Sequence, residues 1–542
     1  MTDPTSSKLT TDPGTTAASP PPDPTSRLWR SIWRTHFYAG IFSIPVLVML
    51  SITGLVILYT DSVTDLQYGD LRRAADTAQV VTLDDQVDAV RSAYPEWNVD
   101  SVTPPVEPGV TTVVSISDAE GETVRNVYVD PSNGSVLGDL DPGAGLVGLA
   151  NRLHGTWNND TLTVPMPMLS GILGEDPAFA PVAVGDLVVE IFAVWTVVLA
   201  ITGLYLWWPR KPGTGRRLFV PRMSKRGRGR WRDLHAISGV VMSVGLVFLV
   251  VTGMPWSDFW GPNWSYVASE VTPNESDFWS MDAPASEVPQ VGDLDRVGNR
   301  VPWAAREDAI PSSSAGGMAG MPGMEGMDGM DAGGGEPPSA TEAESGTPAP
   351  VPAPASLDLV VAAAAEEGMA PNATITMPFD DLEDPASPSY GSFTVTNPWP
   401  SNLSEQGALF LDQFTATTIS RSTSAEWGAL QQASEFGVQT HMGTQFGLAS
   451  RIVMTLTCVL ILWSVFSALV MWWKRRRTGL GFPRRPVDVG LQRVMIVTAV
   501  VLSVIYPIWG LSVVVVLLID TFVIRRVPAL RRTFGQEPVR SS

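Results

Sequence analysis

Apolar residues gather into long runs separated by polar segments. Four runs are long enough to cross a bilayer as single helices, and we place the predicted spans at 29–60, 182–208, 235–256 and 447–473. A fifth apolar stretch, 491–524, is too long for one ordinary span, and Pro507 interrupts it near the middle. We interpret this stretch as a hairpin of two helices, so the pattern predicts a membrane α-helical protein with six transmembrane helices.

The segments between these runs differ in charge. Four of them carry 25 Lys and Arg against 6 Asp and Glu: 1–35, 209–234, 474–490 and 525–542. Two longer ones, 61–181 and 257–446, carry 9 Lys and Arg against 46 Asp and Glu. The positive-inside rule predicts that the basic loops and both termini are cytoplasmic, with two large acidic domains outside. Residues 1–28 are rich in Pro, Thr and Ser and are expected to be a disordered tail.

Each outside domain reads as α+β. The first combines a helical pattern with two alternating patterns and a turn, at Leu83–Tyr94, Thr111–Ser117, Val124–Val129 and Asp130–Gly134. The second has a helical pattern at Leu357–Glu367 and strand patterns at Ser392–Thr396 and Ala408–Asp412. Within the second domain, 311–354 is rich in Gly, Pro, Ala and Ser, which predicts a flexible insert.

The chain also repeats itself. The first and third spans share the pattern H-x3-G-x12-T-G, formed by His36, Gly40, Thr53 and Gly54 and then by His235, Gly239, Thr252 and Gly253. The second and fourth spans are each preceded by a histidine, His154 or His441, and each ends in a Trp pair followed by basic residues. The order of helix, outside domain, histidine and helix thus occurs twice in the same direction, as in a parallel repeat.

Composition narrows the chemistry. The net charge of −19 argues against a nucleic-acid partner. The one cysteine, Cys458, excludes a disulfide framework and any all-Cys cluster, and lies mid-span as a packing residue. No G-x-G-x-x-G follows a predicted strand, which argues against a nicotinamide or flavin site. The four histidines therefore carry most of the information.

Topology puts these histidines in two layers, His36 with His235 near the cytoplasmic face and His154 with His441 near the outer face. Boundary histidines can be ordinary interfacial residues, but matched positions in a repeat favour a function. A proton relay has little support beyond Glu190, and a transition-metal ion would be short of ligands. Two bis-histidine haem b groups fit best, because Gly40 and Gly239 would let a flat macrocycle approach the backbone.

Several motifs together resemble the PepSY-associated transmembrane family of bacterial inner-membrane proteins. They are Trp-Arg-x-His36, Thr53-Gly54, Asp130-Pro-x-x-Gly134, Leu153-His154-Gly, Thr202-Gly203 with Trp207-Trp208-Pro-Arg, and Pro507-x-x-Gly510. The resemblance implies PepSY-like outside domains, location in the bacterial cytoplasmic membrane, and two His-ligated haems as in ferric-siderophore reductases. The second domain departs from it, since Asp412-Gln-Phe-Thr-Ala lacks the Asp-Pro-x-x-Gly turn, and the fourth span lacks the Thr-Gly.

Two further features are candidates for binding. A ladder of methionines recurs at every third residue, and soft thioethers favour Cu(I); its members are Met318, Met321, Met324, Met327 and Met330. The other reading of the ladder is a low-complexity linker. In the spans, Arg451 could hold a haem propionate or pair with Glu190, or both side chains could reach the outer interface.

The sequence therefore favours a membrane metalloreductase. Electrons from a quinol or a separate reductase would pass through both haems to a ferric siderophore or Cu(II) outside. A non-enzymatic alternative is a PepSY module that restrains a protease or an envelope partner. A third is a copper-binding or import protein that uses the methionine ladder without haem.

Overall fold

The computed structural model describes residues 24–75, 80–174, 177–209, 227–273, 353–379, 390–397, 400–476, 482 and 493–534. In this part of the chain, five segments are long and apolar enough to span a membrane. They are α1 (Pro24–Leu58), α6 (Val184–Trp207), α7 (Arg228–Gly253), α11 (Leu448–Arg475) and α13 (Pro507–Ile519) with the π-helical turn η7 (Asp520–Ile524). The sixth expected span, α12 (Arg493–Ile505), has 13 residues, about 20 Å, which is short of a hydrocarbon core of about 30 Å.

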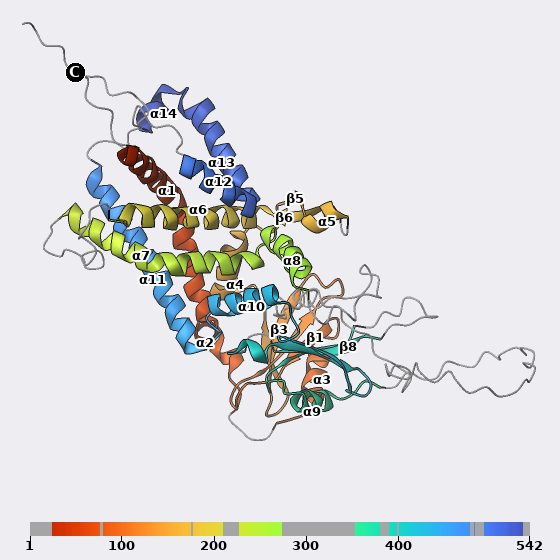
Figure 1. Cartoon of the computed structure of the whole chain (residues 1–542). Coiled ribbons are helices and arrows are strands. Elements are labelled where there is room, and N and C mark those ends of the chain that lie inside the picture. The colour runs from red at the N-terminus through yellow and green to blue at the C-terminus, as the bar shows by residue number, and fades with distance from the viewer. Residues whose placement is uncertain are drawn as a thin grey trace, which may run out of the picture.

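Four of these helices form a bundle in which each contacts two others. Helices α1 and α7 each pack against both α6 and α11, and Figure 1 shows the four helices gathered on one side of the sheet domain. At mid-height the core contains buried side chains from all four helices: Leu47, Ala200, Leu246, Ile461 and Val465. The two predicted repeats, α1 with α6 and α7 with α11, thus enclose one common core.

The C-terminal hairpin lies beside this bundle. Helices α12 and α13 pack against each other, and α13 packs against α6. Pro507 is the first residue of α13, where its missing N–H does no harm, so the chain breaks where the sequence predicts. Trp195 of α6 donates a hydrogen bond from Nε1 to Oγ of Ser512 at 3.2 Å, which ties the hairpin to the bundle.

The strands of both outside segments join in one antiparallel sheet, in the order β10-β9-β8-β7-β1-β2-β3-β4. The N-terminal half holds β1 (Asn98–Thr103), β2 (Thr112–Ser117), β3 (Val124–Asp130) and β4 (Ser135–Leu140). The C-terminal half holds β7 (Thr374–Thr376), β8 (Ser392–Thr396), β9 (Gly407–Asp412) and β10 (Thr418–Thr423). The halves meet at β1 and β7, where Val102 pairs with Ile375.

Two helices complete this domain, α3 (Leu83–Ala93) and α9 (Leu357–Glu366). They bury one face of the sheet in a shared core that contains residues of both halves, such as Val87, Val114 and Leu409. The helices also cap each other: the carboxylate of Asp84 accepts from the N–H of Leu357 at 3.0 Å, and Asp358 accepts from the N–H of Leu83 at 3.3 Å. What the sequence divides into two domains is one folded unit.

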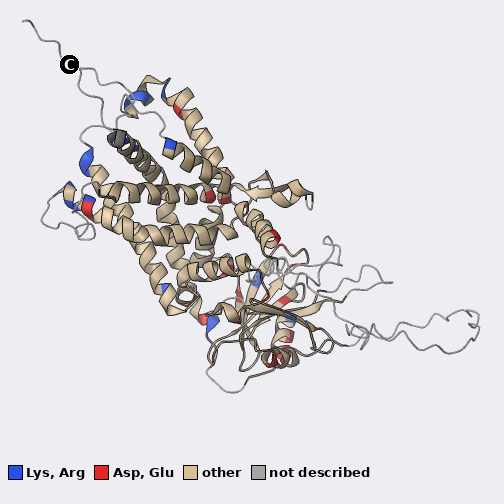
Figure 2. Cartoon of the chain, in the orientation of Figure 1, with Lys and Arg blue, Asp and Glu red and all other residues tan. Residues whose placement is uncertain are grey.

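Short elements connect the sheet to the bundle. They are α2 (Thr60–Arg72), α4 (Gly145–Thr156), the β5–β6 hairpin (Thr163–Pro167 and Phe179–Ala183) with α5 (Leu169–Leu173), η2 (Met254–Trp256), α8 (Trp260–Val271), η6 (Leu403–Glu405) and α10 (Ala429–His441), while α14 (Pro528–Thr533) follows the hairpin. We call the end of the bundle near α4 and α10 the sheet end, and the opposite end the tail end. Lys and Arg mark the tail end, and Asp and Glu are frequent in the sheet domain (Figure 2).

Candidate functional site

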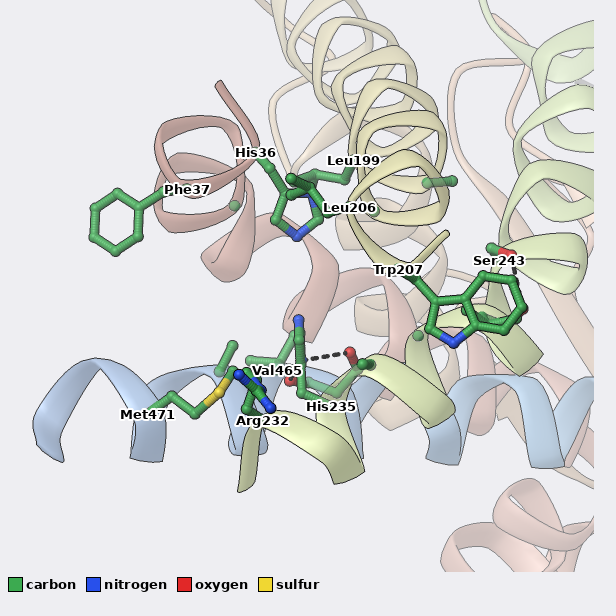
Figure 3. Close-up of a pocket in the computed structure, with 18 of the residues that line it drawn as sticks. His36, Phe37, Leu199, Leu206, Trp207, Arg232, His235, Ser243, Val465 and Met471 are labelled. Carbon is green, nitrogen blue, oxygen red and sulfur yellow. Dashed lines mark hydrogen bonds between the residues drawn. The ribbon is translucent and has the colours of Figure 1, made fainter. Parts of the chain in front are cut away.

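Two histidines face each other near the tail end of the bundle. His36 comes from α1 and His235 from α7, and their ring centroids lie 6.4 Å apart with an interplanar angle of 69°. Both line a cavity of about 750 Å³ among the four bundle helices, which we call the tail-end cavity. Figure 3 shows the two imidazoles pointing toward one another, with Trp207 to one side and Arg232 and Met471 near His235.

The other two histidines form a matching pair near the sheet end. His154 lies on α4 and His441 on α10, and their ring centroids are also 6.4 Å apart, with an interplanar angle of 85°. They line a second cavity of about 320 Å³, the sheet-end cavity. All four histidines are therefore brought together in two pairs, and each pair takes one member from each repeat.

Each histidine is held through the same nitrogen. Nδ1 of His36 lies 2.9 Å from Oγ1 of Thr202. Nδ1 of His154 lies 2.8 Å from Oγ1 of Thr53, and Nδ1 of His441 lies 3.0 Å from Oγ1 of Thr252. These three hydroxyls donate to the carbonyl oxygen four residues earlier on their own helices. An oxygen that already donates its proton accepts from the histidine, so Nδ1 carries the hydrogen and the lone pair of Nε2 is left for another partner.

His235 reaches the same state with different residues. Its Nδ1 lies 3.1 Å from the backbone oxygen of Ser464 and 3.2 Å from Oγ of Ser467, both on α11. A carbonyl only accepts, so this Nδ1 also carries the hydrogen. In the fourth span, which lacks the Thr-Gly pattern, a backbone oxygen and a serine hydroxyl therefore hold the histidine in place of a threonine.

The glycine of each Thr-Gly makes room for the ring that the threonine holds. A methyl group at Gly54 would lie 3.4 Å from Cε1 of His154, one at Gly203 would lie 3.2 Å from Cε1 of His36, and one at Gly253 would lie 3.1 Å from Cε1 of His441. The last two distances are tighter than ordinary van der Waals contact. Each Thr-Gly dipeptide therefore forms a cradle for a histidine from another segment of the chain.

The pairs fit bis-histidine ligation of haem. Two imidazoles that bind one iron at about 2 Å each place their ring centroids about 6.3 Å apart, close to the 6.4 Å observed in both pairs. Both predicted glycines line the tail-end cavity; a methyl group at Gly40 would approach Leu199, whereas one at Gly239 would meet nothing within 4 Å. Among the described residues, no three His, Cys, Asp or Glu side chains converge on a metal site.

The protonation state of the sheet-end pair also suits a ligand. Burial lowers the pKa of His154 to about 4. Burial, together with the proximity of His154, lowers the pKa of His441 to about 3. Both imidazoles are therefore neutral at physiological pH, which is the form that binds a metal.

A thin apolar layer separates the two cavities. Leu47, Leu246 and Ile461 line both of them, and these side chains belong to the buried mid-bundle core. At these positions a single layer of side chains separates the two cavities.

The predicted residues in the spans have other positions. Arg451 is on α11 but is absent from the described lining of the sheet-end cavity, so the structure does not bring it to the histidine pair. Glu190 lines that cavity, yet its Oε1 accepts from the N–H of Trp260 at 2.9 Å and of Phe259 at 3.3 Å. Glu190 is therefore engaged by the start of α8, and within the described residues no ion pair joins it to Arg451. The methionine ladder lies outside the described residues.

Sequence reasoning missed the partners of the histidines. The Thr-Gly pattern was visible, but the role of Thr53, Thr202 and Thr252 depends on which segments lie together. Ser464 and Ser467 carry no signal of their own in the sequence. Asp186, buried beside Glu190 on α6, was also missed, although an acidic residue within an apolar run is a signal that could have found it.

Fold and site together define a membrane-embedded helical bundle with two matched histidine pairs and an extramembrane antiparallel sheet. The family model described as the PepSY-associated TM region matches residues 33–475. The chain belongs to this family. No curated protein shows a significant match to the chain.

Proposed function

We propose that this protein is a di-haem b electron-transfer protein of the bacterial cytoplasmic membrane. The observation that carries the proposal is the presence of two histidine pairs at different depths of one bundle. Both have the same ring separation, and every histidine is hydrogen-bonded through Nδ1. Haem bound between each pair would supply a one-electron carrier at each depth. The histidines would ligate iron through Nε2, while the threonine, serine and carbonyl oxygens would fix the ring orientation.

The proposed reaction is reduction of a metal substrate outside the membrane, a ferric siderophore or Cu(II). A quinol or a separate reductase would supply electrons at the tail end, which the positive-inside rule makes cytoplasmic. The apolar layer of Leu47, Leu246 and Ile461 supports electron transfer rather than transport, because it separates the cavities with packed side chains. In this orientation both termini are cytoplasmic, and the hairpin of α12 and α13 enters the membrane from the cytoplasmic side and returns to it, because α12 is too short to span the hydrocarbon core.

The test is the haem content of the detergent-purified chain, measured by pyridine haemochrome with oxidised and reduced absorption spectra. We expect two b-type haems per chain with low-spin bands. His36→Ala and His154→Ala should each lose one, and neither should support external metal reduction. Ser512→Ala, on α13 away from both cavities, is the control and should keep both. A chain without a Soret band after expression with ample haem would end the proposal.

Copper binding is a second candidate that one observation favours. Three thioethers and a thiol line the sheet-end cavity beside the histidines, from Met254, Met442, Met454 and Cys458. Soft sulfur and imidazole ligands together select Cu(I), and the methionine ladder would add an external site for the same ion. Cu(I) titration of the haem-loaded and the haem-free chain separates a copper site in this cavity from one in the ladder alone. Haem and Cu(I) compete for His154 and His441 only if copper occupies this cavity.

A further inference from the structure

The two cavities differ in the charges that surround them. Among the described residues, Arg228, Arg232 and Arg475 line the tail-end cavity together with one acid, Asp233. Asp233 lies 3.2 Å from Arg232, and the guanidinium of Arg475 lies 4.6 Å from the ring centre of Trp33. Three guanidinium groups against one carboxylate leave this cavity with a positive surrounding.

The sheet-end cavity has the opposite character. Asp186 and Glu190, one turn apart on α6 and each 4% exposed, line it, and its described lining contains no Lys or Arg. Oδ2 of Asp186 accepts from the N–H of Asp258 at 3.0 Å, and Oε1 of Glu190 accepts from two further backbone N–H groups. Repulsion between two carboxylates this close limits the pair to at most one negative charge, held together with one proton. The hydrogen bonds from backbone N–H donors favour this singly charged form over the fully protonated pair.

These charges act on two sites that are otherwise alike. Both have two histidines with protonated Nδ1 and nearly equal ring separation, so the ligands give no reason for different reduction potentials. A positive surrounding favours the reduced state of a redox centre, and a negative one favours the oxidised state. The effect is strong in a bundle core, where the dielectric constant is low.

On the basis of the proposed function, we infer that the sheet-end centre has the lower reduction potential. Electron transfer from the tail-end centre to the sheet-end centre is then unfavourable by itself, and the membrane voltage drives it outward. A quinol at the tail end gives up its electrons one at a time and releases its two protons there. Each electron crosses to the sheet end and reduces one ferric or cupric ion. The cytoplasmic side of a bacterial membrane is electrically negative, so the voltage favours every electron that moves outward.

This arrangement suits the proposed substrate class. A tightly chelated ferric ion has a low reduction potential, because its ligands stabilise the higher charge. A sheet-end centre with a low potential is a stronger reductant for such a complex than the tail-end centre would be. The voltage across the bundle offsets the unfavourable internal step, which the thin layer at Leu47, Leu246 and Ile461 keeps short.

The first test is a spectroelectrochemical titration of the whole haem-loaded chain in detergent. We expect two one-electron transitions, of which His154→Ala removes the lower and His36→Ala the upper. Glu190→Gln keeps an acceptor for Trp260 but loses the charge, and should raise only the lower potential. Arg228→Gln should lower only the upper one, with Arg475→Gln as a second variant if the first fails to fold. Asp139→Asn, a carboxylate of the sheet, is the control and should move neither.

The second test puts the chain in liposomes with dithionite trapped inside and ferric nitrilotriacetate outside. External iron(II) is followed with ferrozine while a potassium gradient and valinomycin set the voltage. An inside-negative voltage should accelerate reduction several-fold, and an inside-positive voltage should slow it. A lower potential at the tail-end centre, or a rate independent of voltage, would overturn the inference. Absence of haem would instead overturn the proposed function, so the two failures are distinct.

Discussion

A hydroxyl that has already donated its proton decides how three of the four histidines can act. Thr53, Thr202 and Thr252 each donate to the backbone oxygen four residues earlier and can only accept from Nδ1 of a histidine. The hydrogen bond thus selects one tautomer and one ring orientation at the same time. The hydroxyl hydrogen of each threonine bonds to its own helix, and the hydroxyl oxygen accepts from Nδ1. The helix thereby fixes which nitrogen of the imidazole, Nε2, is free to bind a ligand.

We predict that Thr252→Val weakens haem binding at the sheet-end pair, because valine keeps the shape of threonine but cannot accept from His441. Loss of such a hydrogen bond to a ligand typically lowers metal affinity about 10- to 100-fold. The measurement is the rate of haem transfer to apomyoglobin, and one of the two haems should leave faster. Thr252→Ser should behave as wild type, as should Thr455→Val, whose hydroxyl contacts Arg451 and Tyr59 instead. Equal transfer rates for Thr252→Val and wild type would contradict the assigned role.

A second residue-scale prediction concerns Asp100 in the sheet. Burial raises the pKa of Asp100 from 3.8 to about 6, although a hydrogen bond from Ser117 at 2.8 Å opposes the shift. Its other oxygen, Oδ2, is buried without a partner. The folded state therefore holds a proton that the unfolded state has lost, and this residue's contribution to stability falls as the pH rises from about 4 to about 6.

Asp100→Asn removes this titration and keeps an oxygen for Ser117. At pH 7 the variant should be more stable than wild type by about 1–2 kcal/mol, allowing for partial exposure, and the difference should vanish near pH 4. Thermal unfolding of the sheet across this pH range is the measurement. Asp88→Asn, at an exposed helix position paired with Arg91, is the control. A constant difference between pH 4 and pH 7 would show that Asp100 does not titrate in this window.

At the scale of elements, two turns with different sequences have one geometry. In the turn 130–134, the N–H of Gly134 donates to the oxygen of Asp130 at 2.8 Å, and in the turn 412–416, Ala416 donates to Asp412 at 2.8 Å. The fifth residue is left-handed in both, with φ of 72° at Gly134 and 54° at Ala416. The second half of the sheet thus keeps the turn of the first without its Asp-Pro-x-x-Gly sequence.

The two turns should respond differently to exchange of their last residues. Gly134→Ala puts a side chain in the left-handed region and should destabilise the sheet by about 1 kcal/mol, since the nearest side chain, Val81, is at an ordinary 3.5 Å. Ala416→Gly relieves that strain but removes a buried methyl group. Burial of that group contributes about 0.8 kcal/mol to the free energy of unfolding, so the two effects nearly cancel. Thermal unfolding of both variants in detergent measures the contrast. A fully stable Gly134→Ala would show that the turn adapts.

The elements that the sequence predicts are those with a clean periodic pattern. The helices α3 and α9 and the strands β2, β3, β8 and β9 lie within a residue or two of the expected positions. The prediction misses β1, in which a bulge between Val99 and Ser101 breaks the alternation, and β7, which has three residues. It also misses the β5–β6 hairpin and both edge strands of the sheet, β4 and β10, of which β10 has mostly exposed and polar side chains. Short, bulged and edge strands leave no pattern that a single sequence can reveal.

At the scale of the whole molecule, the repeat explains which parts of the site could be foreseen. Depth in the membrane already placed one histidine of each repeat in each layer, and the structure adds that the two rings of each layer face each other. The cradles could not be foreseen, because each joins distant segments, such as Thr53 with His154 and Thr252 with His441. Likewise, only the assembled chain shows that the strands of both halves form one sheet.

The last prediction separates the reductase from a copper carrier. The methionine ladder belongs to the segment between α8 and α9, which the structure describes only up to 273 and again from 353. Because loop length has a small effect on closure entropy, deletion of 318–330 should leave the bundle and both histidine pairs intact. Replacement of the five methionines by serine keeps the length and is the matched control for the deletion.

If the proposed function holds, both variants should retain two haems and reduce external ferric chelate at the wild-type rate, because the proposed electron path lies between the histidine pairs. Both should lose about one equivalent of Cu(I) in a competition titration against bicinchoninate, since thioethers are the ligands removed. If metal reduction disappears along with the copper, the ladder takes part in the reductase itself. If Cu(I) binding persists in full, the sulfur atoms around the sheet-end cavity hold the ion, and the ladder has no role as its ligand.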